Sequence, residues 1–300
     1  MLLRLLDWSK SYCLPGFDGV PVYTIVSFVY KESLRDTITT RANSIAFNFL
    51  LAIFPAIIFL FTLIPLMPFS EYYTNVIKNT LDSALPENAS TYFLDIIKGI
   101  TMQKHGGLLS LGFLLSAFFA SNGMVTLMSG FDKSYDKTFK KRSYVKQFGI
   151  ALILTQLLII LFLFSVVFVV IGDEVLAWIL DLMNIEGGAF ISNGWSLILA
   201  VLVIYTSITI IYRYGPSMHK RTAFISPGAI LATVLSIITS IGFSFFVNHF
   251  GRYNEIYGSI GALIVIMIWL QLNAFILLIG FELNAGIAVN RDLLADWEED

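Results

Sequence analysis

The sequence predicts an all-α membrane protein that crosses the bilayer with six transmembrane helices. Six apolar runs of about 18 to 26 residues alternate with polar loops, and a helix needs about 20 residues to cross the hydrocarbon core. Hydrophobic residues make up 57% of the chain and charged residues 13%, whereas a soluble domain carries about 25% charge. No run alternates apolar and polar residues, which excludes a transmembrane barrel. The runs cover residues 44–67, 108–130, 148–172, 195–212, 226–246 and 259–283.

The distribution of Lys and Arg predicts that both termini are cytoplasmic. Most of the 19 basic residues precede the first run, follow the sixth, or lie in the loops after the second and fourth runs. The loop after the third run has no basic residue but holds Asp173, Glu174, Asp181 and Glu186. Positive loops stay in the cytoplasm. The simplest explanation of the basic loop 133–146 is therefore topology, with contact to RNA or anionic lipid as the alternative.

The chain divides into an N-terminal segment, one membrane domain and a tail. Residues 1–43 hold apolar residues at helical spacing after Pro21, which predicts an amphipathic helix on the cytoplasmic membrane surface. The six-helix domain covers 44–284, and its outer loop, 68–107, is expected to form two short amphipathic helices. We expect this loop to serve as a structural scaffold, as a lid over the outer mouth or as a binding site for a partner. Residues 285–300 form an acidic cytoplasmic tail.

Polar residues within the runs predict where a substrate path would lie, because polar groups in lipid are costly. Gln271 and Glu282 share one face of the sixth helix, and Asn273 lies near the opposite face, so this helix should be central. Each polar candidate also suits hydrogen bonding between helices. Proline inside a span kinks the helix. The candidates are Asn48, Pro55, Asn122, Gln156, Gln271, Asn273 and Glu282.

Glu282 is the only acidic residue in the six runs, and two interpretations of it stay open. In the first, its carboxylate pairs with a cytoplasmic arginine such as Arg41 or Arg213. In the second, it is a site that responds to protons or cations.

Small residues at every fourth position of the fifth run predict a close approach between helices. This seam would lie inside the protein or join two copies in a homo-oligomer. The second run has the same pattern in Gly112, Ser116 and Ala120. The residues of the fifth run are Gly228, Ala232, Ser236, Ser240 and Ser244.

The sequence indicates no catalytic residue, no metal site and no cofactor. His105, His219 and His249 lie far apart, and Cys13 is the lone cysteine, so no ligand cluster is expected. There is no phosphate-binding glycine loop and no nucleophile elbow. A net charge of −2 gives no general attraction to nucleic acid. The expected partners are membrane lipids and a small solute or lipid substrate.

The C-terminal third carries a specific motif, Tyr-Asn-x-x-Tyr-Gly-Ser-x-Gly-Ala, at residues 253–262. With residues 226–229, 269–285 and 41–55, it resembles the YihY/BrkB membrane family, over about residues 36–290. The resemblance implies a six-helix protein of the bacterial inner membrane that is concerned with transport of envelope components. The family also carries a virulence label and an old ribonuclease BN label, which is regarded as a misassignment.

Tyr253, Asn254 and Tyr257 of this motif stand just before the sixth helix at the outer surface. Tyr favours the headgroup level, and Asn with Gly suits a tight turn. We expect these residues to form a structured turn between two spans or a binding rim at the outer mouth.

These observations predict a multi-pass protein of the bacterial inner membrane that transports a solute or handles lipid or envelope components. Its polar path would run beside the sixth helix. One alternative is a non-transporting scaffold that binds partners through the outer helices or the cytoplasmic loops. The other is a tRNA-processing ribonuclease, for which the sequence shows no clustered acids or histidines.

Overall fold

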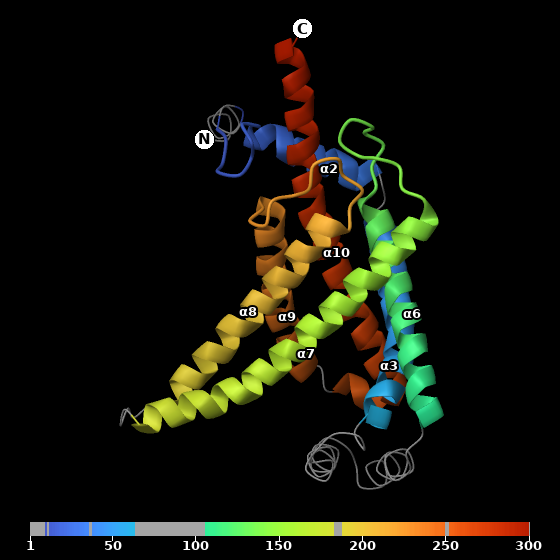
Figure 1. The fold of residues 1–300 in the computed structure, drawn as a ribbon, viewed down its shortest axis with the longest axis vertical. Coiled ribbons are helices and arrows are strands. Elements are labelled where there is room, and N and C mark those ends of the chain that lie inside the picture. Colours follow the sequence, from blue (N-terminus) through green and yellow to red (C-terminus); the bar gives the residue numbers. More distant parts are fainter. Residues whose placement is uncertain are drawn as a thin grey trace. The chain divides into compact units, whose positions relative to one another are not determined.

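Seven helices and no β-strand form the part of the chain that the structure describes (Figure 1). This computed structural model describes residues 10, 12–35, 38–63, 106–182, 188–249 and 252–299. Six of the helices are long and apolar enough to cross a membrane, which confirms the predicted all-α fold. The orientation of the termini stays a prediction. The helices are α2 (Val22–Arg35), α3 (Ile38–Leu63), α6 (Gly106–Phe131), α7 (Tyr144–Leu182), α8 (Gly188–Tyr214), α9 (Pro227–His249) and α10 (Arg252–Glu299).

Two helices run past the ends that the apolar pattern predicts. α7 continues from the expected end at 172 to Leu182, because residues 175–182 keep apolar residues at helical spacing. α10 extends to Glu299, so the acidic tail is the last part of a 48-residue helix. The outer loop expected at 68–107 lies outside the described residues, except for the first residues of α6.

The prediction of a tight turn just before the sixth span is wrong. Tyr253, Asn254 and Tyr257 lie in the first turns of α10. No proline interrupts this stretch, and a single glycine such as Gly258 costs a helix only about 1 kcal/mol. The possible outer rim stays a prediction, because the side chains of these residues are outside the description.

α2 confirms the predicted amphipathic helix of the N-terminal segment. It lies across α10, and its inner face packs against that helix (Figure 1). Its other face exposes Tyr23, Val26 and Tyr30. The contact between the two helices is an apolar cluster of Phe17, Val20, Val22, Ile25, Val29, Leu283 and Ile287.

Two compact units make up the chain, Asn48–Ala120 and the remainder. In the smaller unit, α3 and α6 approach closely, since a Cβ on Gly112 would lie 3.1 Å from the backbone nitrogen of Phe59. The ring centroids of Phe59 and Phe113 are 5.4 Å apart beside this contact. In the larger unit, α7 packs against α8, α8 against α9, and α9 against α10.

The small residues of α9 form part of an internal seam with α10. Gly228 and Gly280 face each other, and a Cβ on Gly280 would lie 2.8 Å from the carbonyl oxygen of Gly228 and 2.8 Å from the Cβ of Ala232. Ala232 is fully buried, Ser236 is 7% exposed, and Ser244 at the far end is exposed. The expected close approach is therefore confirmed within one chain for the first half of the stripe, and its use between copies stays a prediction.

Polar contacts hold the first turn of α9 at this seam. Ser226 precedes Pro227, and its Oγ accepts a hydrogen bond from the backbone N–H of Ala229 at 3.3 Å. Serine before a first-turn proline is a favoured start of a helix. Asn284 of α10 accepts from the N–H of Gly228 at 2.9 Å and donates to Ser226 Oγ at 3.1 Å. One side chain thus ties the start of α9 to α10.

We expect Gly228→Ala to lower the free energy of unfolding by about 1 to 3 kcal/mol, because the new methyl group would clash with the backbone of α10. Thermal unfolding of the purified protein in detergent micelles measures this loss. Gly242→Ala on the same helix is the control, since nothing lies within 4 Å of its added Cβ. Equal stability of the two variants would contradict the proposed close approach.

Candidate functional site

A buried ion pair joins α10 to the loop that follows α6. Glu282 is fully buried, and its Oε1 lies 2.6 Å from the Nζ of Lys133, whose side chain is 1% exposed. The same Nζ lies 3.4 Å from Oε2 of Glu32 on α2. Tyr135 donates its hydroxyl to Oε1 of Glu32 at 3.2 Å. One ammonium group therefore connects carboxylates from two helices that are far apart in the sequence.

Lys133 makes the 2.6 Å contact with Glu282, and the predicted pairing of Glu282 with Arg213 is wrong. A pairing of Glu282 with Arg41 stays a prediction. Arg213 instead donates to the carbonyl oxygen of Thr222 at 2.7 Å. Arg41 donates to the carbonyl oxygen of Gly130 at 3.1 Å. The sequence does not distinguish Lys133 from the other basic residues of its loop, because a lysine just after a span is also what orientation requires. A role of Glu282 in sensing protons or cations stays a prediction.

Aromatic rings surround the backbone next to this ion pair. Phe281 precedes Glu282, and its ring centroid lies 4.3 Å from that of Phe131 and 6.0 Å from that of Tyr212. Tyr212 donates its hydroxyl to the carbonyl oxygen of Leu277 at 2.7 Å. Such pairs contribute about 0.5 to 1.5 kcal/mol each beyond the area they bury. The rings help keep the Lys133–Glu282 contact out of water.

The other polar candidates for a path are spread over several helices. Asn122 on α6, Gln156 on α7 and Gln271 on α10 are half-buried. Asn273 is also half-buried and donates to the carbonyl oxygen of Trp269, one turn earlier, at 2.9 Å. Neither of the two pockets described below is lined by these residues. A polar path beside α10 stays a prediction.

Asn48 and Pro55 belong to the smaller unit of the chain, Asn48–Ala120. Both are half-buried, and Pro55 lies inside α3, where a span with a proline was expected. Their part in a path stays a prediction.

Two loops, 132–143 and 215–226, are joined by hydrogen bonds in the larger unit, and together they are called the clasp. Lys140 donates its backbone N–H to the carbonyl oxygen of Ser217 at 2.8 Å, and His219 donates to that of Thr138 at 2.9 Å. The guanidinium of Arg142 donates to the carbonyl oxygens of Gly215 and Pro216 at 3.0 and 3.1 Å. These bonds hold the basic residues of both loops in one place.

Asp132 and Arg142 are two interacting charged residues of the clasp. Ser217 donates its hydroxyl to Asp132 at 2.8 Å. Partial burial raises the pKa of the Asp132 carboxyl from its ordinary value, while the bond from Ser217 and the charges of Arg142 and Arg41 act against this rise. Burial lowers the pKa of the Arg142 guanidinium, and Asp132 opposes that shift. Asp132 and Arg142 therefore partly offset each other's charge.

A basic pocket of about 490 Å³ lies beside this clasp. Its apolar wall is the start of α7, with Ile150, Ile153, Leu154 and Leu157. These residues lie inside the candidate span Tyr144–Ser165. Its positive rim consists of Lys140, Lys141, Arg142, Lys146, Arg213 and Arg221.

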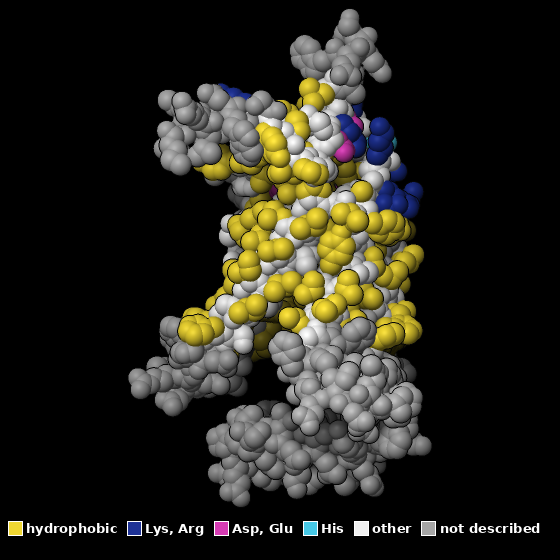
Figure 2. Space-filling model, turned by 90° about the vertical axis from the view of Figure 1, so that its left-hand side faces the viewer, with side chains coloured by type: hydrophobic (Ala, Val, Ile, Leu, Met, Phe, Trp, Pro, Cys, Tyr) yellow, Lys and Arg dark blue, Asp and Glu magenta, His cyan; other side chains and the backbone are white. Residues whose placement is uncertain are grey.

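The basic pocket lies where an apolar span meets a charged loop. Ile153 is 64% exposed and Leu157 41% exposed, so the apolar wall continues into an open hydrophobic surface. Figure 2 shows Lys and Arg side chains gathered close to a broad hydrophobic surface. Lys and Arg favour the headgroup level of a membrane, and apolar side chains favour the acyl level. The pocket therefore offers both kinds of surface to one ligand.

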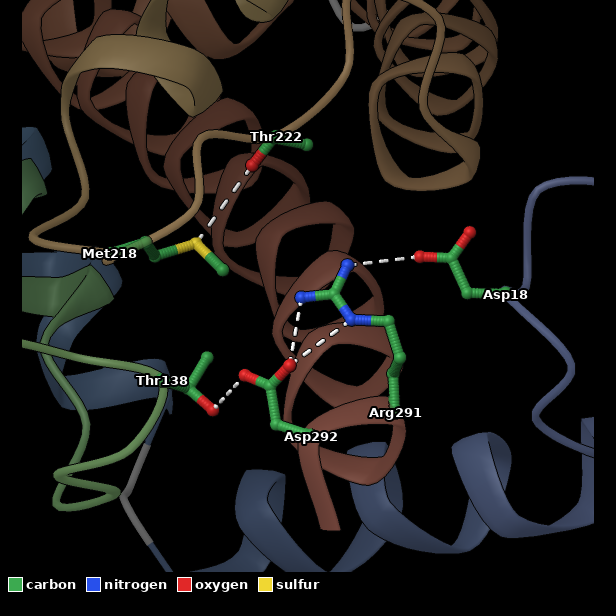
Figure 3. A network of polar contacts seen from close by, with 6 residues as sticks. All are labelled: Asp18, Thr138, Met218, Thr222, Arg291 and Asp292. Atoms are coloured by element: carbon green, nitrogen blue, oxygen red, sulfur yellow. Dashed lines mark hydrogen bonds and ion pairs between the residues drawn. The ribbon is translucent and has the colours of Figure 1, made fainter. Parts of the chain in front are cut away.

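A second pocket is also lined by the loop 215–226, and it contains both a carboxylate and basic side chains. Arg291 of α10 lines it and donates to Oδ2 of Asp18 and Oδ1 of Asp292, at 3.1 and 2.9 Å (Figure 3). Thr138 donates to Oδ2 of Asp292 at 2.8 Å. This network ties the turn before α2 and the first basic loop to the end of α10.

The sequence did not predict the basic pocket, because its residues come from two loops and two helices that are separated in the chain. The loop 133–146 had an anionic-lipid interpretation, but nothing in the sequence joined it to Arg213, Met218 or Arg221. The backbone pairing of Lys140 with Ser217 brings the two loops together. Pairing between loops has no periodic pattern in a sequence and so was not predictable.

The family model described as virulence factor BrkB matches residues 29–299, nearly the whole described fold. The chain belongs to the BrkB family. YfkH of Bacillus subtilis, which bears a ribonuclease-like label, is 30% identical over 257 residues, covering 85% of this chain and 91% of YfkH. A UPF0761 membrane protein of Tolumonas auensis is 23% identical over 305 residues, covering 98% and 94% of the two chains. No solved structure matches the chain.

A shorter similarity covers part of this BrkB-family chain. A UPF0761 membrane protein of Xanthomonas campestris is 32% identical over 106 residues, which is 35% of this chain and 25% of that protein. These comparisons establish a polytopic membrane protein of a bacterial membrane family.

In this BrkB-family protein we expect Glu282→Gln to lower the free energy of unfolding by about 3 kcal/mol. Removing one member of a buried ion pair leaves the charge of the other poorly compensated. Thermal unfolding in detergent micelles gives the size of the loss.

The double variant Glu282→Gln/Lys133→Met provides the control, because it removes both charges of the Lys133–Glu282 pair. It should lose less stability than the sum of the two single variants. Strictly additive losses would show that Lys133 and Glu282 do not interact.

Proposed function

We propose that this protein is a lipid-handling protein of the bacterial inner membrane. It would bind an anionic amphiphile from the cytoplasmic leaflet and assist its movement across the bilayer. The observation that supports this best is the basic pocket, in which a rim of Lys and Arg borders an apolar wall on α7. A headgroup would lie against the rim and an acyl chain along the wall.

The composition of the pocket favours an amphiphile over a small water-soluble solute. Ligand sites of about 300 to 1,000 Å³ are usual for small molecules, and this pocket of about 490 Å³ fits that range. A solute would leave the exposed side chains Ile153 and Leu157 without a partner. A lipid would cover these side chains and neutralise the rim in a single binding event.

The expected topology supports the cytoplasmic leaflet as the source of the lipid. Both loops of the clasp are rich in Lys and Arg, and such loops stay on the cytoplasmic side. The start of α7 would then face the inner headgroup layer, where anionic lipids give a negative surface potential.

The other two functions have less support. A scaffold that acts through the outer helices concerns a segment outside the described residues, and a scaffold that acts through the cytoplasmic loops stays an alternative. A ribonuclease rests on the label of YfkH and on the family's old name, and the described residues contain no group of three His, Cys, Asp or Glu that could hold a metal ion.

In proteoliposomes, we expect the wild-type protein to speed the transbilayer movement of acyl-labelled phosphatidylglycerol more than that of phosphatidylcholine. The triple variant Lys140→Gln/Lys141→Gln/Lys146→Gln should lower the phosphatidylglycerol rate about tenfold or more, since each lysine near the surface contributes about 1 kcal/mol to binding an anionic lipid. Loss of fluorescence on addition of a membrane-impermeant quencher measures the rate.

Lys31→Gln serves as the matched control, because Lys31 is exposed on α2 and does not line the basic pocket. This variant should move both lipids at the wild-type rate. Equal acceleration of the two lipids by the wild-type protein, or acceleration of neither, would contradict the proposal.

A further inference from the structure

The basic pocket carries more positive charge than one singly charged headgroup would neutralise. The negative charge of Asp132 acts on the guanidinium of Arg142, but Asp132 does not line the pocket. The lining itself contains no Asp or Glu. Close cations repel one another unless an anion lies between them. Apart from Arg142, the basic residues of the lining are Lys140, Lys141, Lys146, Arg213 and Arg221.

The second pocket shows that this excess is not a general property of the loops. It shares Arg221 with the basic pocket and also contains Lys220 and Arg291. There, however, Asp18 lies 3.1 Å from Arg291, and Asp292 lies 2.9 Å from it. Arg291 in the second pocket thus has carboxylate partners, whereas the lining of the basic pocket contains no carboxylate.

The rim combines two kinds of hydrogen-bond donor: guanidinium groups that other parts of the protein hold in place, and exposed lysine ammonium groups. Arg142 is held by two carbonyl oxygens, and Arg213 is held by the Thr222 carbonyl and by the Phe224 ring, 4.2 Å from its guanidinium carbon. The Nε–H of Arg213 is buried and has no acceptor among the described residues. Lys140, Lys141 and Lys146 are exposed and form no ion pair within the described part of the chain. Planar guanidinium groups and mobile ammonium groups together suit a phosphate with several free oxygens.

We infer that the basic pocket binds a lipid headgroup that ends in a phosphate monoester. A phosphate monoester carries about −1.5 to −2 charges at neutral pH, and a phosphate diester carries one. Nearby Lys and Arg favour the fully ionised form. α7 begins at the pocket, with Ser143 and Lys146 in the lining, so the positive end of this helix adds to the attraction. The inference rests on the proposed function and specifies its substrate class.

Binding of three lipids with identical acyl chains to the full chain in detergent micelles tests the inference. We expect phosphatidic acid, a phosphate monoester, to bind about tenfold more tightly than phosphatidylglycerol, a diester, because it brings up to one additional charge to the rim. Phosphatidylcholine should bind more weakly than either. Native mass spectrometry across a lipid titration gives the three dissociation constants.

Variants show whether the preference arises in the basic pocket. Lys141→Gln/Lys146→Gln should bring the affinity for phosphatidic acid down to that for phosphatidylglycerol. Lys220→Gln is the control, since Lys220 is exposed in the neighbouring loop and lines only the second of the two pockets. It should keep the full preference for phosphatidic acid. Loss of the preference in the control alone would overturn the assignment to this pocket.

The outcomes separate this inference from the proposed function. In one outcome, phosphatidic acid and phosphatidylglycerol bind with equal affinity, and both more tightly than phosphatidylcholine. That result would overturn the inference of a phosphate monoester and leave the proposed function standing. Binding of all three lipids alike would overturn the proposed function as well. Inorganic phosphate that displaces phosphatidic acid at an equal concentration would show that the pocket takes free phosphate and not a lipid.

Discussion

One buried contact, between the ammonium of Lys133 and the carboxylate of Glu282, positions the loop after α6 against α10 in the larger unit. A buried charge is tolerated only beside an opposite charge, so the loop after α6 has to meet α10 at this point. The same ammonium reaches Glu32, which brings α2 to the same place. From Lys133 the loop 132–143 continues to Lys140 and Arg142, where it pairs with the loop 215–226. The position of the basic pocket therefore depends on this ion pair.

The bilayer imposes the second constraint. Only 17% to 39% of each candidate span is buried inside the protein, so most of the apolar surface is available to lipid. Within the bilayer, an apolar helix face is about as stable against lipid as against another helix. Close packing and hydrogen bonds therefore have to supply the preference for contacts between helices. The contact between Gly228 and Gly280, and the bonds of Asn284 to the start of α9, are devices of this kind. They hold α9 against α10 next to the loop 215–226, which leads into α9.

The clasp and the pocket together explain why basic residues gather where orientation alone would not require them. Orientation needs Lys and Arg on one side of the membrane, but it sets neither their mutual distance nor their partners. Near Arg291 the structure supplies carboxylates, and around Lys140, Lys141 and Lys146 the pocket lining supplies none. Membership of the BrkB family agrees with a membrane protein and leaves the choice of substrate to the site.

The sequence by itself determined the membrane class, the six spans, the amphipathic α2 and the close approach on α9, because length, hydropathy and helical spacing are local properties. It also singled out Glu282, since an acid in an apolar run is conspicuous. It did not identify Lys133 as the partner, the continuous α10 through Tyr253 and Tyr257, or the pocket between two loops. Only the tertiary structure decided these features, because ion pairs, loop pairing and helix continuation depend on residues that are distant in the chain, and no local pattern encodes which of them meet.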